Sequence, residues 1–91
     1  MLRIFEAPKF GRLRERLRST GEREALKKAA QAVIKDRSTG KKLKGEFKDL
    51  RSFRYAVHGQ ARSLIYAWEA DRLTFLSFGP RRASIDRQNE T

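Results

Sequence analysis

Cysteine is absent from this chain of 91 residues, and histidine occurs once. Without cysteine, neither a disulfide nor a thiolate-bound metal can form. The single histidine and the lack of paired carboxylates at ligand spacing argue against a zinc or two-metal site built by the protein. We therefore expect no metal and no cofactor.

Long apolar runs are also missing. No stretch approaches the ~20 apolar residues that a membrane-spanning helix requires, and the N-terminus has no apolar signal-peptide core. We therefore expect a cytoplasmic protein with no membrane partner.

Positive charge is present in large excess. Lys and Arg total 22 against 11 Asp and Glu, which gives a net charge of +11. Such an excess repels itself in a compact state and indicates an anionic partner, which could be nucleic acid, a ribosome, an anionic membrane or an acidic protein. A membrane surface is the least favoured of these, because the apolar helix faces are needed for the core. Between residues 37 and 62, the sequence contains only two acidic residues but eight basic ones: Arg37, Lys41, Lys42, Lys44, Lys48, Arg51, Arg54 and Arg62.

The first half of the chain predicts one strand and two helices. Residues 2–5 form a short apolar run that Pro8 ends. Phe10, Leu13 and Leu17 then share one face of a short helix. A second helix has a core-facing stripe formed by Leu26, Ala29, Ala30, Val33 and Ile34.

The second helix has a recognisable start. Ser19 and Glu22 are three residues apart and fit a capping box, in which the hydroxyl and the carboxylate each satisfy a free backbone N–H.

After Gly40 the apolar period changes from helical to strand-like. Phe53, Tyr55 and Val57 alternate with Arg54, so Arg54 is expected on the opposite face of its strand. Residues 64–68 predict the next strand. Residues 73–78 predict a central strand, which residues 79–80 (Gly-Pro) are expected to end.

The predicted architecture is a two-layer α+β domain with the order β-α-α-β-β-β. An N-terminal strand and a helical hairpin precede a three-stranded antiparallel meander, all within one domain of residues 1–91. The polar tail from Ala83 is expected to be loose. The hairpin covers one face of the sheet, and the arginines can stand on the other.

In this order of elements, the sequence resembles the RelE/ParE superfamily of type II toxins. The resemblance rests on four landmarks in sequence order: GKKLKG at residues 40–45, L-R-x-x-R within residues 50–57, an R-to-Y strand at residues 62–66, and G-x-R at residues 79–81. It implies a RelE-like fold.

The resemblance implies two activities. RelE-like members cut messenger RNA in the ribosomal decoding site without metal, and ParE-like members poison DNA gyrase. Both kinds are held inactive by an antitoxin. The expected partners are therefore a cognate antitoxin and the ribosome with its mRNA, or alternatively DNA gyrase, and the toxin alone is expected to be a monomer.

Metal-free RNA cleavage needs a proton acceptor for the 2′-hydroxyl, cations for the phosphorane and an acid for the leaving oxygen. By the resemblance, Arg81 would stabilise the phosphorane, Arg54 would hold the backbone phosphate, and Arg62 would complete the catalytic set. His58 is a candidate acid or base, because its ordinary pKa lies near neutrality, although it lies in a predicted turn. The expected docking contacts to nucleic acid are Lys42, Lys44, Lys48, Arg51 and Arg82.

Two positions depart from the family pattern. A tyrosine is expected four residues after the closing arginine, but Ile85 stands there. Arg62 and Tyr66 are also one residue further apart than the pattern, and a one-residue slip in a strand changes the face. Either a bulge restores Arg62 to the helix-free face or Arg62 does not serve there.

Three function classes therefore stay open: a ribosome-dependent endoribonuclease, a gyrase inhibitor, and a catalytically degenerate protein that binds nucleic acid or its antitoxin.

Overall fold

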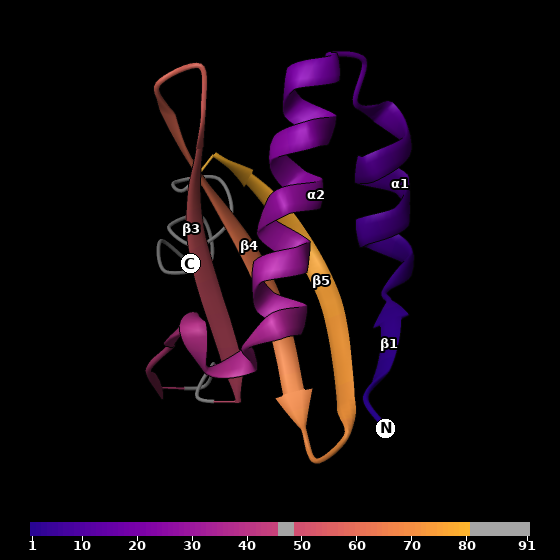
Figure 1. Ribbon diagram of the computed structural model, residues 1–91, viewed down its shortest axis with the longest axis vertical. Coiled ribbons are helices and arrows are strands. Elements are labelled where there is room, and N and C mark those ends of the chain that lie inside the picture. Colours follow the sequence, from indigo (N-terminus) through magenta and orange to yellow (C-terminus); the bar gives the residue numbers. More distant parts are fainter. Residues whose placement is uncertain (46–48, 81–91) are drawn as a thin grey trace.

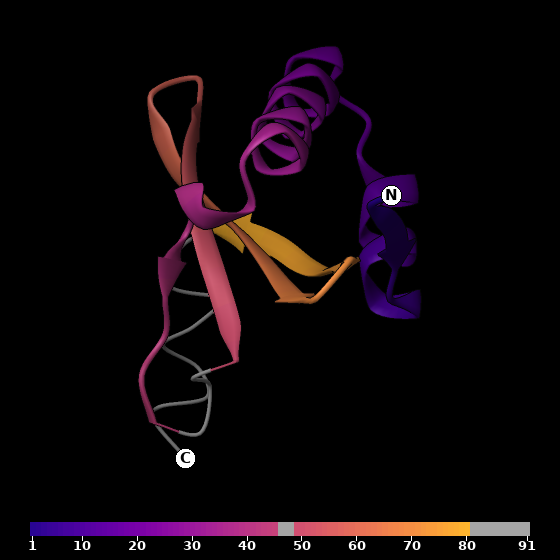
Figure 2. The same cartoon turned by 60° about the horizontal axis from the view of Figure 1, so that its bottom comes forward.

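The computed structural model describes residues 1–45 and 49–80. It is an α+β fold in which a five-stranded sheet of order β1-β5-β4-β3-β2 carries two helices, α1 and α2, on one side (Figures 1 and 2). The predicted order β-α-α-β-β-β is confirmed. The structure adds one short strand, β2, after the helices. The elements are β1 (Arg3–Glu6), α1 (Pro8–Arg16), α2 (Thr20–Lys35), a 3-10 turn (Arg37–Thr39), β2 (Lys41–Lys42), β3 (Leu50–Val57), β4 (Gln60–Glu69) and β5 (Arg72–Pro80).

The two helices begin where local chemistry favours a start. Pro8 occupies the first turn of α1, where its missing N–H costs nothing. Ser19 caps α2 by accepting a hydrogen bond from the Glu22 backbone N–H at 3.3 Å. That half of the predicted capping box is confirmed. The Glu22 carboxylate instead contacts Arg62.

The helices pack on different strands of one sheet face. α1 lies against β5, and α2 lies against β3 and β4 (Figure 1). The apolar stripe of α2 contributes Leu26, Ala29 and Val33 to the buried core, as its period predicts.

The sheet is antiparallel except at one edge. β3, β4 and β5 form the predicted meander, whereas β1 pairs parallel to β5 from Arg3 opposite Arg72 to Glu6 opposite Phe75. β1 is therefore the partner of the last strand, although it is the first element of the chain. β5 lies between β1 and β4, as expected for its apolar sequence.

The last strand runs two residues further than the predicted 73–78 and includes Gly79 and Pro80. β5 continues through Gly79 opposite Ser63 and Pro80 opposite Arg62. Beyond Phe75, β5 has no neighbour on the β1 side among the described residues. Proline is tolerated there because an edge position does not require a second ladder hydrogen bond.

The core lies between the helices and the sheet. Phe10 of α1 contacts Phe75 at 5.5 Å and Phe78 at 5.3 Å between ring centroids. Leu64, Leu73 and Val33 are completely buried, and each such side chain stabilises the fold by about 1.5–3 kcal/mol. Within residues 1–45 and 49–80, neither helix has the length and hydropathy that crossing a bilayer requires.

Tyr66 fastens the segment after α2 to the sheet. Its ring is fully buried, and its hydroxyl donates to the Arg37 carbonyl at 2.6 Å and accepts from the Gly40 N–H at 3.0 Å. A β carbon at Gly40 would clash with the Tyr66 hydroxyl, so glycine is required by close approach. This contact sets where β2 begins.

Candidate nucleic-acid interface

Four cations line one groove beside β3. The groove has a volume of about 570 Å³ and is formed by β2, the segment that follows it, and β3, with Ser63 of β4 on its floor. Among residues 1–45 and 49–80, no acidic residue lines it. The cations are Lys41, Lys42, Lys44 and Arg54, and the remaining lining residues are Thr39, Leu43, Ser52, Phe53 and Ser63.

Strand pairing positions Lys41 on the face of Arg54 and Lys42 on the face of Arg51. Lys41 lies opposite Ser52 and Lys42 opposite Arg51, and the Leu43 N–H extends the pairing by donating to the Leu50 carbonyl at 3.0 Å. By strand alternation, Lys41 shares the face of Ser52 and therefore that of Arg54.

Arg54 occupies the helix-free face for the reason that its sequence pattern predicts. Phe53 and Tyr55, on either side of it, pack against the core, so the side chain between them points the other way. Arg54 itself is exposed.

The positive charge of this groove is not neutralised from within. Lys41, Lys42, Lys44 and Arg54 are all exposed, and across residues 1–45 and 49–80 none of them forms an ion pair. Four adjacent cations without an acid concentrate a positive potential that attracts a polyanion.

Arg62 lies on the other face of the sheet. Its guanidinium contacts the Glu22 carboxylate at 3.2 Å and the Gln60 side-chain oxygen at 3.2 Å, and its side chain is only 16% exposed. Arg62 and Arg54 therefore lie on opposite faces, so the structure does not bring these two predicted catalytic residues together.

The position of the bulge explains the face of Arg62. Between β4 and β5, Ile65 lies opposite Ser77 and Tyr66 opposite Phe75, which leaves Leu76 of β5 without an opposite residue. The register between β3 and β4 has no irregularity. The bulged residue thus belongs to β5 and not to β4, so β4 alternates regularly and Arg62 keeps the face of Leu64 and Tyr66.

Arg51, a predicted docking residue, is held by the protein's own backbone. Its guanidinium donates to the Gly40 carbonyl at 2.8 Å and to the Ser38 carbonyl at 3.4 Å. It also lies 5.4 Å from the ring centroid of Trp68, and Arg37 contacts the same ring at 5.6 Å. In this position Arg51 fastens the segment after α2 to the end of the sheet.

His58 lies at the tip of the β3–β4 hairpin, outside the groove. His58 and Gly59 have φ values of 51° and 79°, which are the positive values of a two-residue hairpin turn. The ring lies beside the start of α2, because a β carbon at Gly21 would come within 3.0 Å of the His58 Nε2 atom. Four strand residues, or about 13 Å, separate His58 from Arg54.

Neither tyrosine near these arginines can act as a base at neutral pH. The pKa of Tyr55 is raised to about 12, chiefly by burial; Arg62 lowers it in part, and Glu22 makes a smaller raising contribution. Burial also raises the pKa of Tyr66, although the hydrogen bond from Gly40 opposes this. Both phenols therefore stay protonated.

Several predicted residues lie outside the described part of the chain: Lys48, Arg81, Arg82 and the family-divergent position Ile85. Among the residues that the structure does describe, no three His, Asp or Glu side chains gather closely enough to hold a metal ion. Lys41 is a groove residue that was not among the predicted site residues. The adjacent lysines at positions 41 and 42 were the signal that could have identified it.

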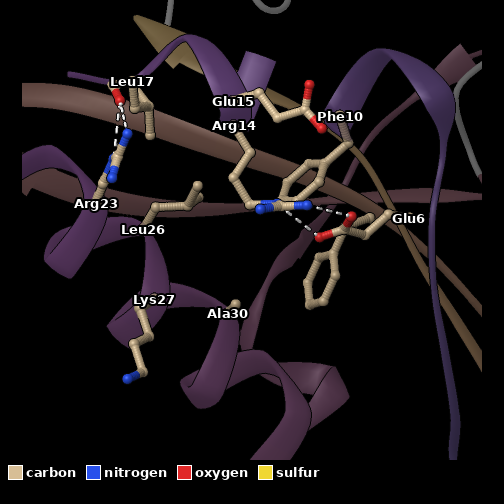
Figure 3. A pocket seen from close by; sticks show the side chains of 10 residues that line it. Glu6, Phe10, Arg14, Glu15, Leu17, Arg23, Leu26, Lys27 and Ala30 are labelled. Atoms are coloured by element: carbon tan, nitrogen blue, oxygen red, sulfur yellow. Dashed lines mark hydrogen bonds and ion pairs between the residues drawn. The ribbon is translucent and has the colours of Figure 1, made fainter. Parts of the chain in front are cut away.

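A second concavity of about 530 Å³ lies between α1 and α2 (Figure 3). Two of its three cations are already engaged: Arg14 pairs with Glu6 through two contacts of 3.1 Å, and Arg23 donates to the Leu17 carbonyl at 2.6 and 2.8 Å. Its floor is apolar and includes Phe10, Leu26, Ala30 and Phe75. This hollow is thus chemically unlike the groove beside β3.

Comparisons with known proteins agree with the fold. A model of the family described as ParE-like toxin of type II bacterial toxin–antitoxin systems matches residues 4–84. A solved structure, the solution structure of the conserved hypothetical protein HP0894 from Helicobacter pylori, is similar in fold, with a TM-score of 0.54 and 19% identity. The similarity covers 87% of this chain and 93% of that one. No curated protein matches the sequence significantly.

The resemblance to the RelE/ParE superfamily is therefore confirmed. The chain belongs to the ParE-like toxins of type II bacterial toxin–antitoxin systems, a family whose members have an antitoxin partner.

Proposed function

We propose that this toxin binds a phosphodiester backbone in the groove beside β3. Its target would be messenger RNA on the ribosome, and it would cleave that RNA without a metal ion. The observation that carries the proposal is the set of four exposed cations at Lys41, Lys42, Lys44 and Arg54, none of which forms an ion pair within residues 1–45 and 49–80. A groove with this charge and, among those described residues, no acidic lining attracts the consecutive phosphates of a nucleic-acid backbone.

Within the groove the four cations have different roles. Arg54 is assigned to the scissile or adjacent phosphate, because its planar fork binds two phosphate oxygens and stays protonated. The lysines hold flanking phosphates as point charges. Arg81 keeps the charge-stabilising role that the family resemblance implies. Arg62 is assigned a role in stabilising the fold, because its guanidinium forms an ion pair with Glu22.

The second candidate function is inhibition of DNA gyrase. Two observations favour it. Among the described residues, the groove contains no histidine and no carboxylate, and His58 lies at the hairpin tip instead. The matching family is also described as ParE-like. A groove of this kind can hold the backbone of gyrase-bound DNA without performing chemistry on it.

One induction experiment separates these functions. The toxin is expressed from a tightly controlled promoter, and transcript ends, translation rate and DNA breaks are read from the same culture. Ribonuclease activity predicts transcripts cut within codons and a halt in translation before any DNA damage response. Gyrase inhibition predicts DNA breaks with intact transcripts, and loss of supercoiling activity in a purified gyrase assay.

Two variants assign the effect to the groove. The double variant Lys41→Gln with Arg54→Gln should relieve growth arrest. The matched control is Arg12→Gln with Lys9→Gln, which removes the same charge from exposed positions of α1, and it should remain toxic. Equal toxicity of both variants would refute a role for the groove. No growth arrest, together with salt-sensitive RNA binding, would instead assign the protein to the catalytically degenerate class.

A further inference from the structure

A hollow of about 470 Å³ lies at the end of the sheet where β3 begins and β4 ends. Pockets of this size commonly bind small ligands. This Trp68 hollow is lined by Lys42, Asp49, Arg51, Trp68 and Glu69, together with two alanines at the end of β4. Lys42 also lines the groove beside β3, so the two concavities adjoin at β2.

Trp68 is an exposed ring that the protein nevertheless holds in place. It is the single tryptophan of the chain and is 36% exposed. Its indole Nε1–H donates to the Ala70 carbonyl at 3.0 Å. The guanidinium groups of Arg37 and Arg51 lie 5.6 and 5.4 Å from its ring centroid. The orientation of the ring is therefore fixed before any ligand arrives, which lowers the entropic cost of binding one.

Both arginines contact Trp68 from the same part of the chain. Arg37 donates to the Ile34 carbonyl, and Arg51 donates to the carbonyls of Ser38 and Gly40. The two guanidinium groups are thus anchored to residues 34–40 and leave the other side of the indole to the hollow. An aromatic surface held in this way stacks on an unpaired nucleobase and strengthens binding about tenfold or more per base.

The Trp68 hollow differs from the groove in its carboxylates. Asp49 and Glu69 line it, both are exposed, and neither forms an ion pair within residues 1–45 and 49–80. Carboxylates repel phosphate, so the hollow is unsuited to a second stretch of nucleic-acid backbone. They accept hydrogen bonds, however, and therefore suit the donor groups of a base.

One RNA base matches a carboxylate better than the others. Guanine presents two adjacent donors on its Watson–Crick edge, N1–H and N2–H, which the two oxygens of one carboxylate can accept together. In adenine and cytosine the amino donor lies beside a ring nitrogen that is an acceptor, and in uracil the N3–H lies between two carbonyl oxygens. A carboxylate facing any of these three bases would meet an acceptor.

We propose that the Trp68 hollow binds an unpaired guanine of the nucleic acid whose backbone lies in the groove beside β3. The base stacks on Trp68, its donor edge faces the carboxylate of Asp49 or Glu69, and Lys42 binds the phosphate between the base and the groove. The inference rests on the proposed function, because it requires a nucleic acid in the groove. It gives the toxin a base preference that phosphate contacts alone cannot supply.

The single tryptophan makes a direct test possible, because its fluorescence reports from within the hollow. Wild-type toxin is titrated with the RNA hexamers UUGUUU and UUUUUU and with inorganic polyphosphate, which has no base. The guanine hexamer should quench Trp68 and bind about tenfold more tightly than the uridine hexamer. Polyphosphate should compete with labelled RNA for the groove without quenching. Inosine in place of guanine lacks the N2 donor and should lose most of the preference.

The outcomes separate this site from the proposed function. Equal affinity for the two hexamers, or binding of the guanine hexamer without a change in fluorescence, would overturn the base site and leave the phosphate groove intact. Failure of all the probes to bind would overturn both. Since base preference is measured by binding alone, it can be observed even where the induction experiment finds transcripts uncut.

Variants identify the groups that select the base. Asp49→Asn with Glu69→Gln should remove most of the guanine preference, as measured by fluorescence anisotropy of labelled hexamers. The matched control is Glu15→Gln with Glu24→Gln, which removes the same charge from exposed helix positions, and it should retain the preference.

Trp68→Leu should bring the two hexamers to similar, weaker affinities while the salt slope stays as in the wild type. Circular dichroism reports on the fold of each variant. A guanine preference that survives in both the folded Trp68→Leu variant and the carboxylate variant would refute the site. If Trp68→Leu does not fold, the carboxylate variant decides, because its substituted side chains are exposed.

Discussion

Arg51 and Arg54 lie three positions apart on the same strand, and they face opposite sides of the sheet. Arg51 is turned toward the helices, where two backbone carbonyls and Trp68 occupy its guanidinium. Arg54 is turned away from them and has no acidic partner among the described residues. The odd spacing alone produces this difference.

The comparison extends to the two faces as wholes. On the helix side, Arg37, Arg51 and Arg62 each hydrogen-bond to groups of the chain itself. On the other side, the groove cations are left for an external anion. In a chain with 22 basic residues, the number of arginines in a segment therefore says little about nucleic-acid contact. What matters is which guanidinium groups already form hydrogen bonds within the protein.

The largest expected effect comes from removing the groove charges. The triple variant Lys41→Gln, Lys42→Gln, Arg54→Gln should bind a short single-stranded RNA about 100-fold more weakly at 0.1 M salt, because three phosphate contacts are lost. The slope of log affinity against log salt should fall by about 2. Fluorescence anisotropy across a salt series measures both quantities.

A control with equal charge change makes that comparison strict. Neutralising Lys9, Arg12 and Lys27, which are exposed on the helices, removes three cations elsewhere and should lower the slope by much less. The same slope in the two triple variants would mean that total charge, and not the groove, determines binding.

The helix-side arginines should behave in the opposite way. Arg51→Met should lower the free energy of unfolding by about 2 kcal/mol, because charged hydrogen bonds to two carbonyls are lost. The salt slope for RNA should stay as in the wild type. Urea unfolding gives the first value and anisotropy the second. A lowered salt slope with unchanged stability would place Arg51 among the nucleic-acid contacts.

A substitution at Tyr66 tests whether its hydroxyl holds the segment before β2 in place. β2 contains two of the groove lysines, Lys41 and Lys42. Tyr66→Phe should lower the free energy of unfolding by about 1.5 kcal/mol, because the Gly40 N–H and the Arg37 carbonyl lose their hydrogen-bond partner. RNA affinity should fall slightly, because β2 is held less firmly. The measurement is urea unfolding together with exchange of the Gly40 amide, and an amide as slow as in the wild type would contradict the assignment.

The smallest effect concerns pH. The folded-state pKa of Tyr55 is raised to about 12, above an unfolded value near 10. The neutral phenol is therefore favoured by folding, so its contribution is present below about pH 10 and is lost as pH rises toward 12. Because the ring is only half-buried, the change is about 1 kcal/mol after allowance for solvent screening.

Tyr55→Phe isolates that contribution from the titration of the lysines. The difference in unfolding free energy between the variant and the wild type should move in favour of the variant between pH 9.5 and pH 11.5, as measured by urea unfolding. A constant difference over this range would show that Tyr55 titrates normally.

Local periodicity was sufficient to predict most of the fold. The alternation of Phe53, Tyr55 and Val57 with Arg54 is a property of adjacent residues, and it correctly predicted the face of Arg54. The helix stripe at Leu26, Ala29 and Val33 was predictable for the same reason.

The rest depended on contacts between residues distant in sequence. The partner of Arg62 is Glu22, 40 residues away, and no local pattern indicates that pairing. The face of Arg62 was nevertheless predictable, because Arg62, Leu64 and Tyr66 occupy every second position of one strand and therefore share a face. β2 was missed because two lysines carry no apolar signal, and its position is set by the Tyr66 hydroxyl.

The parallel pairing of β1 with β5 has a consequence for synthesis. The first strand of the nascent chain has no neighbour in the sheet until Arg72–Phe75 have emerged from the ribosome that makes them. The ring of Phe10 likewise cannot form its core contacts until Phe75 and Phe78 have been synthesised. Folding therefore cannot proceed segment by segment from β1 onward, and the sheet cannot be completed until the codons of β5 have been translated.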